Sequence, residues 1–172
     1  RLAWRNDATW APHGGESRID VAARGMPLLA ELFADQTEWG TDEPERPVVL
    51  VGHSLACALI ARWAQEYPGQ TKHVRGALLV APSDTEAQSY PTGTTGFTPM
   101  PLKTLPFNAI TVASTNDPYV SRERATAFSD AWGSELVWLE NAGHINAEGG
   151  VGAWPQGIEL LFKLTGDPQF NS

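Results

Sequence analysis

The sequence has little cysteine, few basic residues and no long apolar run, and each of these shortages excludes a class of protein. One cysteine cannot build an internal disulfide framework or a cysteine-rich metal site. The 12 Lys and Arg against 20 Asp and Glu give a net charge of −8, which disfavours binding to nucleic acid. No apolar run approaches the roughly 18 residues that span a bilayer. Because no signal-peptide pattern is present either, we expect a cytoplasmic protein without a membrane partner.

What the chain does contain is typical of a globular domain. It has 172 residues, of which 42% are hydrophobic and 19% are charged. This length is close to one domain and is sufficient for a hydrophobic core. We therefore expect a single domain over residues 1–172, with a hydrolase-like core at 46–165 and an atypical segment at 1–45.

Short apolar runs alternate with helical patterns from residue 48 onward. This alternation predicts an α/β fold with a doubly wound, mainly parallel sheet and helices on both faces. The expected strands are 48–51, 77–81, 109–114 and 135–139. A tight turn is expected at 52–56, and the expected helices run from this turn to about residue 67, over about 122–132 and over about 154–164. A further helical stripe runs from Ala22 to Phe33, with a break or kink expected at Pro27. The long segment 82–107 holds five prolines and is expected to be a functional loop, such as a lid or cap.

Ligands of parallel sheets bind beyond the carboxyl ends of the strands, so reactive side chains at these ends are informative. Ser54 follows the first buried strand and opens a helix, which is the context of a nucleophile elbow. The G-x-S pattern itself occurs about once by chance in such a chain, and Ser17 provides a second example. An ordinary turn in which Ser54 caps the helix is the alternative. The fifth position of the elbow holds Ala56, where glycine is usual.

Two further strand ends carry groups that could activate a serine. Asp117 follows the third strand and His144 lies in a glycine-flanked loop after the fourth. Taken singly, each is a common loop residue, but together they give the chain order Ser, Asp, His of α/β-hydrolases. A serine hydroxyl needs a base to take its proton, and histidine needs a carboxylate to hold its tautomer. The sequence thus predicts a catalytic triad of Ser54, Asp117 and His144, with the Leu55 backbone N–H as an oxyanion donor.

From about residue 48 to 164 the chain resembles the small YdeN-like serine hydrolases, the family of retinoblastoma-binding protein nine. The resemblance implies a minimal α/β-hydrolase fold and the same three catalytic residues. It rests on V-V-L-V-G-H-S-L at 48–55, A-R-W-A at 61–64, L-L-V-A-P at 78–82, S-T-N-D-P-Y at 114–119, A-W-G at 131–133 and A-G-H-I-N-A-E-G-G-V-G-A-W-P-Q-G at 142–157.

The first 45 residues depart from this family. Its members begin with a strand and a glycine-rich loop that supplies the second oxyanion donor, whereas this N-terminal strand looks missing or replaced here. We therefore expect an impaired hydrolase, since losing one donor typically lowers kcat by about 10²–10³.

Residues 3–33 resemble instead part of a histidine phosphatase of the phosphoglycerate-mutase type. The matching text is A-W-R-N-D, P-H-G-G-E-S-R-I-D-V-A-A-R and P-L-L-A-E-L. The resemblance implies a proton-donor role for Glu16 and a second-histidine position for His53. The R-H-G tripeptide that would carry the phosphorylated histidine is absent from the chain.

These patterns together predict a serine hydrolase that acts on small carboxylic esters. The chemistry implies no metal and no organic cofactor, and the expected partner is a small-molecule ester. Two alternatives stay open: a non-enzymatic binding or interaction protein that keeps the hydrolase fold, and a histidine-phosphatase-like module.

Overall fold

The computed structural model of the chain describes residues 48–90 and 97–165. The helical stripe predicted at 22–33, the phosphatase-like Glu16 and the predicted deficit in the second oxyanion donor all lie outside these residues. They therefore stay predictions.

Within residues 48–90 and 97–165, four parallel strands form a sheet in the spatial order β1-β2-β3-β4. The strands are β1 (Val48–His53), β2 (Val74–Val80), β3 (Asn108–Ser114) and β4 (Glu135–Leu139). Neighbouring strands in space are also neighbours in sequence, so each connection moves one strand further across the sheet. In the register, Leu79 lies opposite Gly52 on one side and Thr111 on the other.

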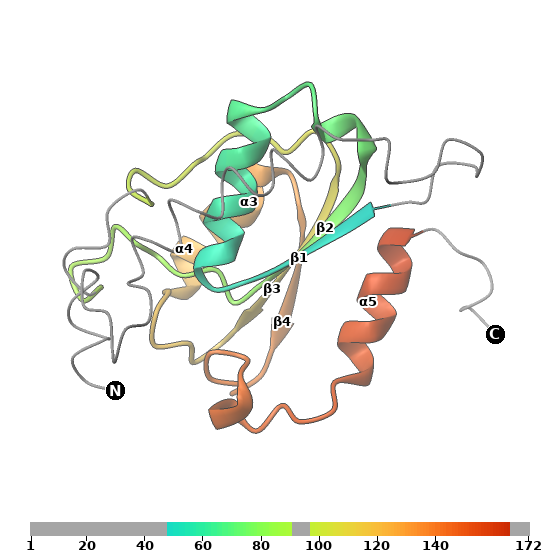
Figure 1. The fold of residues 1–172 in the computed structure, drawn as a ribbon. Helices are drawn as coiled ribbons and strands as arrows, with labels where there is room; N and C mark the ends of the chain where they lie inside the picture. The colour runs from blue at the N-terminus through green and yellow to red at the C-terminus, as the bar shows by residue number, and fades with distance from the viewer. Residues whose placement is uncertain (1–47, 91–96, 166–172) are drawn as a thin grey trace, which may run out of the picture.

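Helices cover both faces of this sheet, as the alternation of elements predicts (Figure 1). Helices α3 (Leu55–Glu66) and α4 (Arg122–Trp132) lie on one face, and α5 (Pro155–Thr165) lies on the other. Two short 3₁₀ turns, η3 (Thr71–His73) and η4 (Ala147–Gly149), lie in the connections. Helix α4 begins at an N-cap, where the Ser121 hydroxyl accepts the Arg124 amide, and ends at left-handed Gly133.

The strands build two hydrophobic clusters because successive side chains point to opposite faces. On β2, Ala77 and Leu79 pack in the cluster under α3 and α4, while Leu78 and Val80 pack in the cluster under α5. Trp63 and Trp132 belong to the first of these clusters and are 0% and 1% exposed. The described residues include no helix with the length and apolar character to cross a bilayer.

Three strands extend beyond their predicted bounds. β1 is expected to end at residue 51 but continues to His53, and β3 begins one residue early at Asn108. The largest difference is at the start of β2. β2 begins at Val74 rather than Ala77. The sequence does not indicate this earlier start, because the charged Arg75 and Gly76 interrupt the apolar run. The glycine is required by packing, since a Cβ at Gly76 would lie 2.9 Å from both the Asn108 carbonyl oxygen on β3 and Leu164 Cδ2 on α5.

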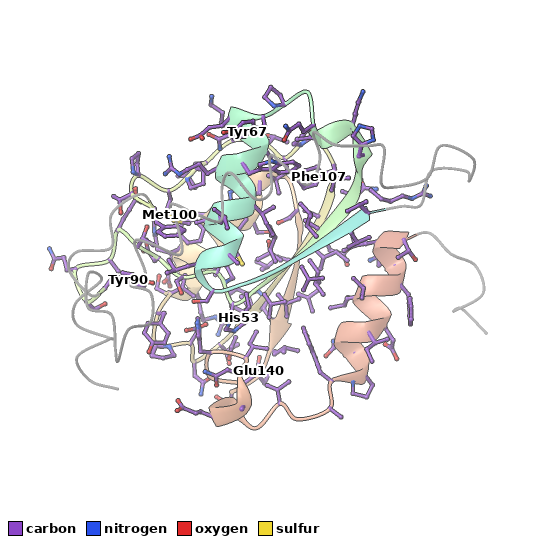
Figure 2. The ribbon with its side chains drawn as sticks, in the orientation of Figure 1. His53, Tyr67, Tyr90, Met100, Phe107 and Glu140 are labelled. Atoms are coloured by element: carbon purple, nitrogen blue, oxygen red, sulfur yellow. The ribbon has the colours of Figure 1, made fainter. Side chains whose placement is uncertain are left out.

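Because all strands run the same way, their carboxyl ends meet at one edge of the sheet. His53 ends β1 and Glu140 follows β4, and Figure 2 places both near the same end of the molecule. Tyr67 and Phe107, which lie near the amino ends of the strands, are at the opposite end (Figure 2). Of the predicted loop 82–107, the described residues Phe97, Met100 and Leu105 are buried in the cluster under α3 and α4.

Candidate active site

Ser54 lies in a tight turn between β1 and α3. Its backbone has φ 61° and ψ −122°, and its amide donates to the Val80 carbonyl at 2.9 Å. The turn brings α3 close to β1, and Gly52 permits this approach. A Cβ at Gly52 would lie 2.7 Å from Ile60 Cδ1 and 3.1 Å from the Ala56 carbonyl oxygen. The strand, turn and helix therefore have the backbone geometry of a nucleophile elbow.

The three residues predicted as a triad lie together at the carboxyl edge. Ser54 Oγ is 2.9 Å from His144 Nε2, and His144 Nδ1 is 2.9 Å from Asp117 Oδ2. The Asp117 side chain is fully shielded from solvent and that of His144 is 10% exposed. Asp117 Oδ1 also accepts the Tyr119 amide at 2.9 Å, which fixes the carboxylate. The geometry joins a hydroxyl, an imidazole and a carboxylate in one line of hydrogen bonds.

Three consecutive side chains hold the loop that carries His144, and sequence reasoning missed them. The hydroxyl oxygens of Thr115 and Ser114 each accept a backbone amide at 3.0 Å, and Asn116 Oδ1 accepts one at 2.8 Å. The donors are the amides of residues 141, 142 and 143, respectively. Residues 114–116 directly precede Asp117 in the S-T-N-D-P-Y stretch, and this position is the signal in the sequence that points to them. Their bonds fix the backbone immediately before the imidazole.

Two aromatic rings also contact His144. The rings of His53 and Tyr119 meet its ring edge-on, with centroid distances of 4.8 and 4.6 Å. His53 Nε2 also lies 2.9 Å from the His144 carbonyl oxygen, so His53 is engaged with the same loop. Among the described residues, no three His, Cys, Asp or Glu side chains form a group that could hold a metal ion.

Leu55 and Cys57 follow Ser54 on α3. The Leu55 amide is the first of the helix, and the first amides of a helix have no intrahelical acceptor. Cys57 is 0% exposed, as expected for a small buried hydrophobe. Burial raises the pKa of its thiol far above the ordinary value. Cys57 is therefore held protonated beside the site.

A second serine, Ser83, also contacts Ser54. Its hydroxyl lies 2.9 Å from Ser54 Oγ, and the residue is 2% exposed. It follows the carboxyl end of β2, the strand end at which sequence reasoning assigned no reactive residue. Its position directly after a strand end is therefore the signal in the sequence that points to Ser83.

Strained backbone is concentrated at this edge. Within the described residues, the non-glycine residues with positive φ are Ser54, Ala81, Asn141 and Ile145, at 61°, 48°, 54° and 48°. Each lies beyond the carboxyl end of a strand, and Ile145 directly follows His144. Such conformations persist only where the surrounding structure enforces them, and they are common at active sites.

The comparison with protein families gives one match over most of the chain. Residues 15–163 match the family model described as "Serine hydrolase". The matched region begins at residue 15, whereas the resemblance based on sequence motifs begins at about residue 48.

Solved structures share the fold. A protein of Pectobacterium atrosepticum described as a YdeN-like hydrolase is 29% identical, with a TM-score of 0.63 over 84% of this chain and 69% of its own. A carboxylesterase of Bacillus cereus is 16% identical, with a TM-score of 0.54 over 90% of this chain and 66% of its own. The second likeness bears on the α/β-hydrolase fold alone.

Curated relatives support the second resemblance over part of the chain. A glucosyl-3-phosphoglycerate phosphatase of Mycobacterium tuberculosis is 71% identical over 63 residues, and one of Mycolicibacterium vanbaalenii is 63% identical over 62 residues. Each match covers 36% of this chain and 28% of the relative. The chain therefore spans little more than a quarter of the length of these phosphatases.

Proposed function

Because the chain belongs to the serine hydrolase family, we propose that it hydrolyses small carboxylic esters with Ser54 as nucleophile, His144 as base and Asp117 as acid. The observation that carries this proposal is the continuous line of hydrogen bonds from Asp117 through His144 to Ser54, with 2.9 Å at each step. Within the proposal, residues 1–172 act as one domain and the protein works in the cytoplasm.

Acylation begins when Ser54 Oγ attacks the acyl carbon of the ester. Its proton passes to His144 Nε2, and the carbonyl π electrons move onto the oxygen. Asp117 holds the proton on His144 Nδ1, so that Nε2 is free to accept, and it stabilises the imidazolium that forms. The Leu55 amide donates to the oxyanion. When the tetrahedral species collapses, His144 returns the proton to the departing alkoxide, and an alcohol leaves.

Deacylation repeats these steps with water. His144 takes a proton from water, the hydroxide adds to the acyl carbon, and the C–O bond to Ser54 breaks. The proton returns to Ser54 Oγ and a carboxylic acid is released, so the enzyme is regenerated without net proton change. The three side chains that these steps use, Ser54, His144 and Asp117, lie within hydrogen-bond distance of one another in the structure.

A fluorophosphonate probe and p-nitrophenyl esters of short acids test the proposal. The wild-type protein should be labelled and should release p-nitrophenol, whereas Ser54→Ala should lose both activities. Ser129→Ala is the matched control, because Ser129 is a buried serine of α4 whose hydroxyl bonds the Ser134 carbonyl, away from the site. Equal labelling of wild type and Ser54→Ala would refute the assignment of the nucleophile.

Phosphatase activity is the second candidate, since part of the chain is 71% identical to a phosphatase. Two facts weigh against it: the R-H-G tripeptide is absent, and His53 is engaged with the His144 loop. Glu16→Gln should leave ester turnover nearly unchanged. Hydrolysis of p-nitrophenyl phosphate that vanished in this variant would reverse the ranking. If the protein neither reacts with the probe nor turns over either substrate, the non-enzymatic alternative is favoured.

A further inference from the structure

We infer that the Ser83 hydroxyl is a fourth member of the reacting group, donating a hydrogen bond to Ser54 Oγ. This inference rests on the proposed role of Ser54 as nucleophile. The two hydroxyl oxygens are 2.9 Å apart, the same distance as from Ser54 Oγ to His144 Nε2. Within the described residues, the Ser83 hydroxyl has Ser54 as its hydrogen-bond partner.

Counting protons sets the direction of this bond. In the reactive state His144 carries its proton on Nδ1, facing Asp117, and Nε2 accepts the Ser54 proton. Ser54 has only this one proton to donate. Its bond to Ser83 must then run the other way, with the Ser83 O–H as donor.

The backbone around Ser83 is held so that its hydroxyl stays at this place. Ala81 has φ 48°, and its amide donates to the Val112 carbonyl at 2.8 Å. On the other side of Ser83, the Asp84 amide donates to the Tyr119 carbonyl at 2.9 Å. The segment is therefore tied to β3 and to the loop that carries Asp117.

The Asp84 side chain adds a charged anchor. Its residue is 5% exposed, and Arg124 on α4 holds both carboxylate oxygens, with Nε to Oδ2 at 2.8 Å and Nη2 to Oδ1 at 3.0 Å. Hydrogen bonding to Asp84 raises the pKa of Arg124 above its ordinary value. The Asp84 side chain is thus held by Arg124, while Ser83, its neighbour, is directed at Ser54.

A donor at this position can do two things for the reaction. The Ser83 hydroxyl occupies one lone pair of Ser54 Oγ. The second lone pair of Oγ is thereby oriented toward the acyl carbon. The Ser83 hydroxyl also stabilises the negative charge that builds on Oγ as the proton moves to His144. Neither effect depends on a contact between Ser83 and the bound ester, so they act on kcat rather than on KM.

Ser83→Ala tests this role, with Ser129→Ala as the matched buried-serine control. We expect kcat for p-nitrophenyl esters and the rate constant of fluorophosphonate labelling to fall by about 10- to 100-fold, as for a hydrogen bond to a charged atom. KM should stay within about twofold. Labelling should still reach completion, because a slow nucleophile eventually reacts fully, whereas a misfolded fraction would not. Cysteine is close in size to serine but is a weaker hydrogen-bond donor. The rates of Ser83→Cys should therefore lie between those of the wild-type protein and Ser83→Ala.

The outcomes separate this inference from the proposed function. If the wild-type protein reacts and Ser83→Ala and Ser83→Cys keep its rates, the inference is wrong and the triad stands. A lowered end point of labelling with an unchanged rate constant would also overturn it, since Ser83 would then be structural only. Should Ser83→Ala not fold, Ser83→Cys alone decides by the same measurements. A wild-type protein that is not labelled at Ser54 would overturn the proposed function, and this inference with it.

Discussion

Gly52 is the position at which a single methyl group should disturb both the fold and the site. In Gly52→Ala the new Cβ would lie 2.7 Å from Ile60 Cδ1, the end of a 4% exposed side chain, and 3.1 Å from the carbonyl carbon and oxygen of Ala56. Ile60 can turn away only within a packed core, and the Ala56 backbone moves only if the start of α3 moves. Overpacking of this kind costs about 1–3 kcal/mol, which corresponds to a fall in Tm of roughly 2–12 °C for a domain of this size.

The same substitution should lower ester turnover, because the start of α3 carries Ser54. A displacement of about 1 Å at reacting groups can cost 10²-fold in rate, so we expect kcat to fall more than the loss of stability alone would give. Thermal unfolding and steady-state kinetics measure the two effects separately. Gly69→Ala is the control, since a Cβ at Gly69 meets no atom within 4 Å.

A double variant distinguishes the two contacts. Ile60→Val removes Cδ1 and by itself costs about 0.5–1.5 kcal/mol. The double variant should lose less stability than the two single variants together, because the clash with Ile60 Cδ1 is relieved. The close contact with the Ala56 backbone remains, so kcat should stay low. If Gly52→Ala were as stable and active as Gly69→Ala, the close approach of β1 and α3 would not be the reason for this glycine.

Two further predictions concern the surroundings of the triad. Ser114→Ala removes the acceptor of the Ala142 amide. It should lower kcat about 2- to 10-fold with KM unchanged, as expected for the loss of one neutral hydrogen bond. Kinetics equal to those of Ser129→Ala would show that residues 114–116 do not position His144. The Cys57 thiol should react with a chromogenic disulfide reagent only upon unfolding, even at mildly alkaline pH, because burial raises its pKa and keeps it protonated; rapid reaction of the native protein would contradict its burial.

Much of the fold could be predicted because buried parallel strands have a strong signature. The run at 109–114 and the alternation around it correspond closely to β3 (Asn108–Ser114), and α4 and β4 lie at the predicted bounds. The same reasoning brought Ser54, Asp117 and His144 to one edge, since parallel strands end together. Their catalytic roles remain predictions.

The support around the triad could not be predicted in the same way. The bond from the Ala142 amide to Ser114 Oγ spans 28 residues and depends on the conformation of two loops. Short polar residues such as Ser114 and Asn116 are common in every loop, so their presence carries little information. Ser83 differs, because its place after a strand end was available to the sequence reasoning.

The four left-handed residues at the carboxyl edge have a consequence for any attempt to make this protein more heat-resistant. A non-glycine residue in this region costs about 1–2 kcal/mol, so substitutions that relax Ala81 or Ile145 are an accessible source of stability. Those substitutions would also release the backbone beside Ser83 and His144. Selection for stability alone should therefore favour variants that have lost turnover, whereas substitutions in the two hydrophobic clusters can raise stability without this penalty.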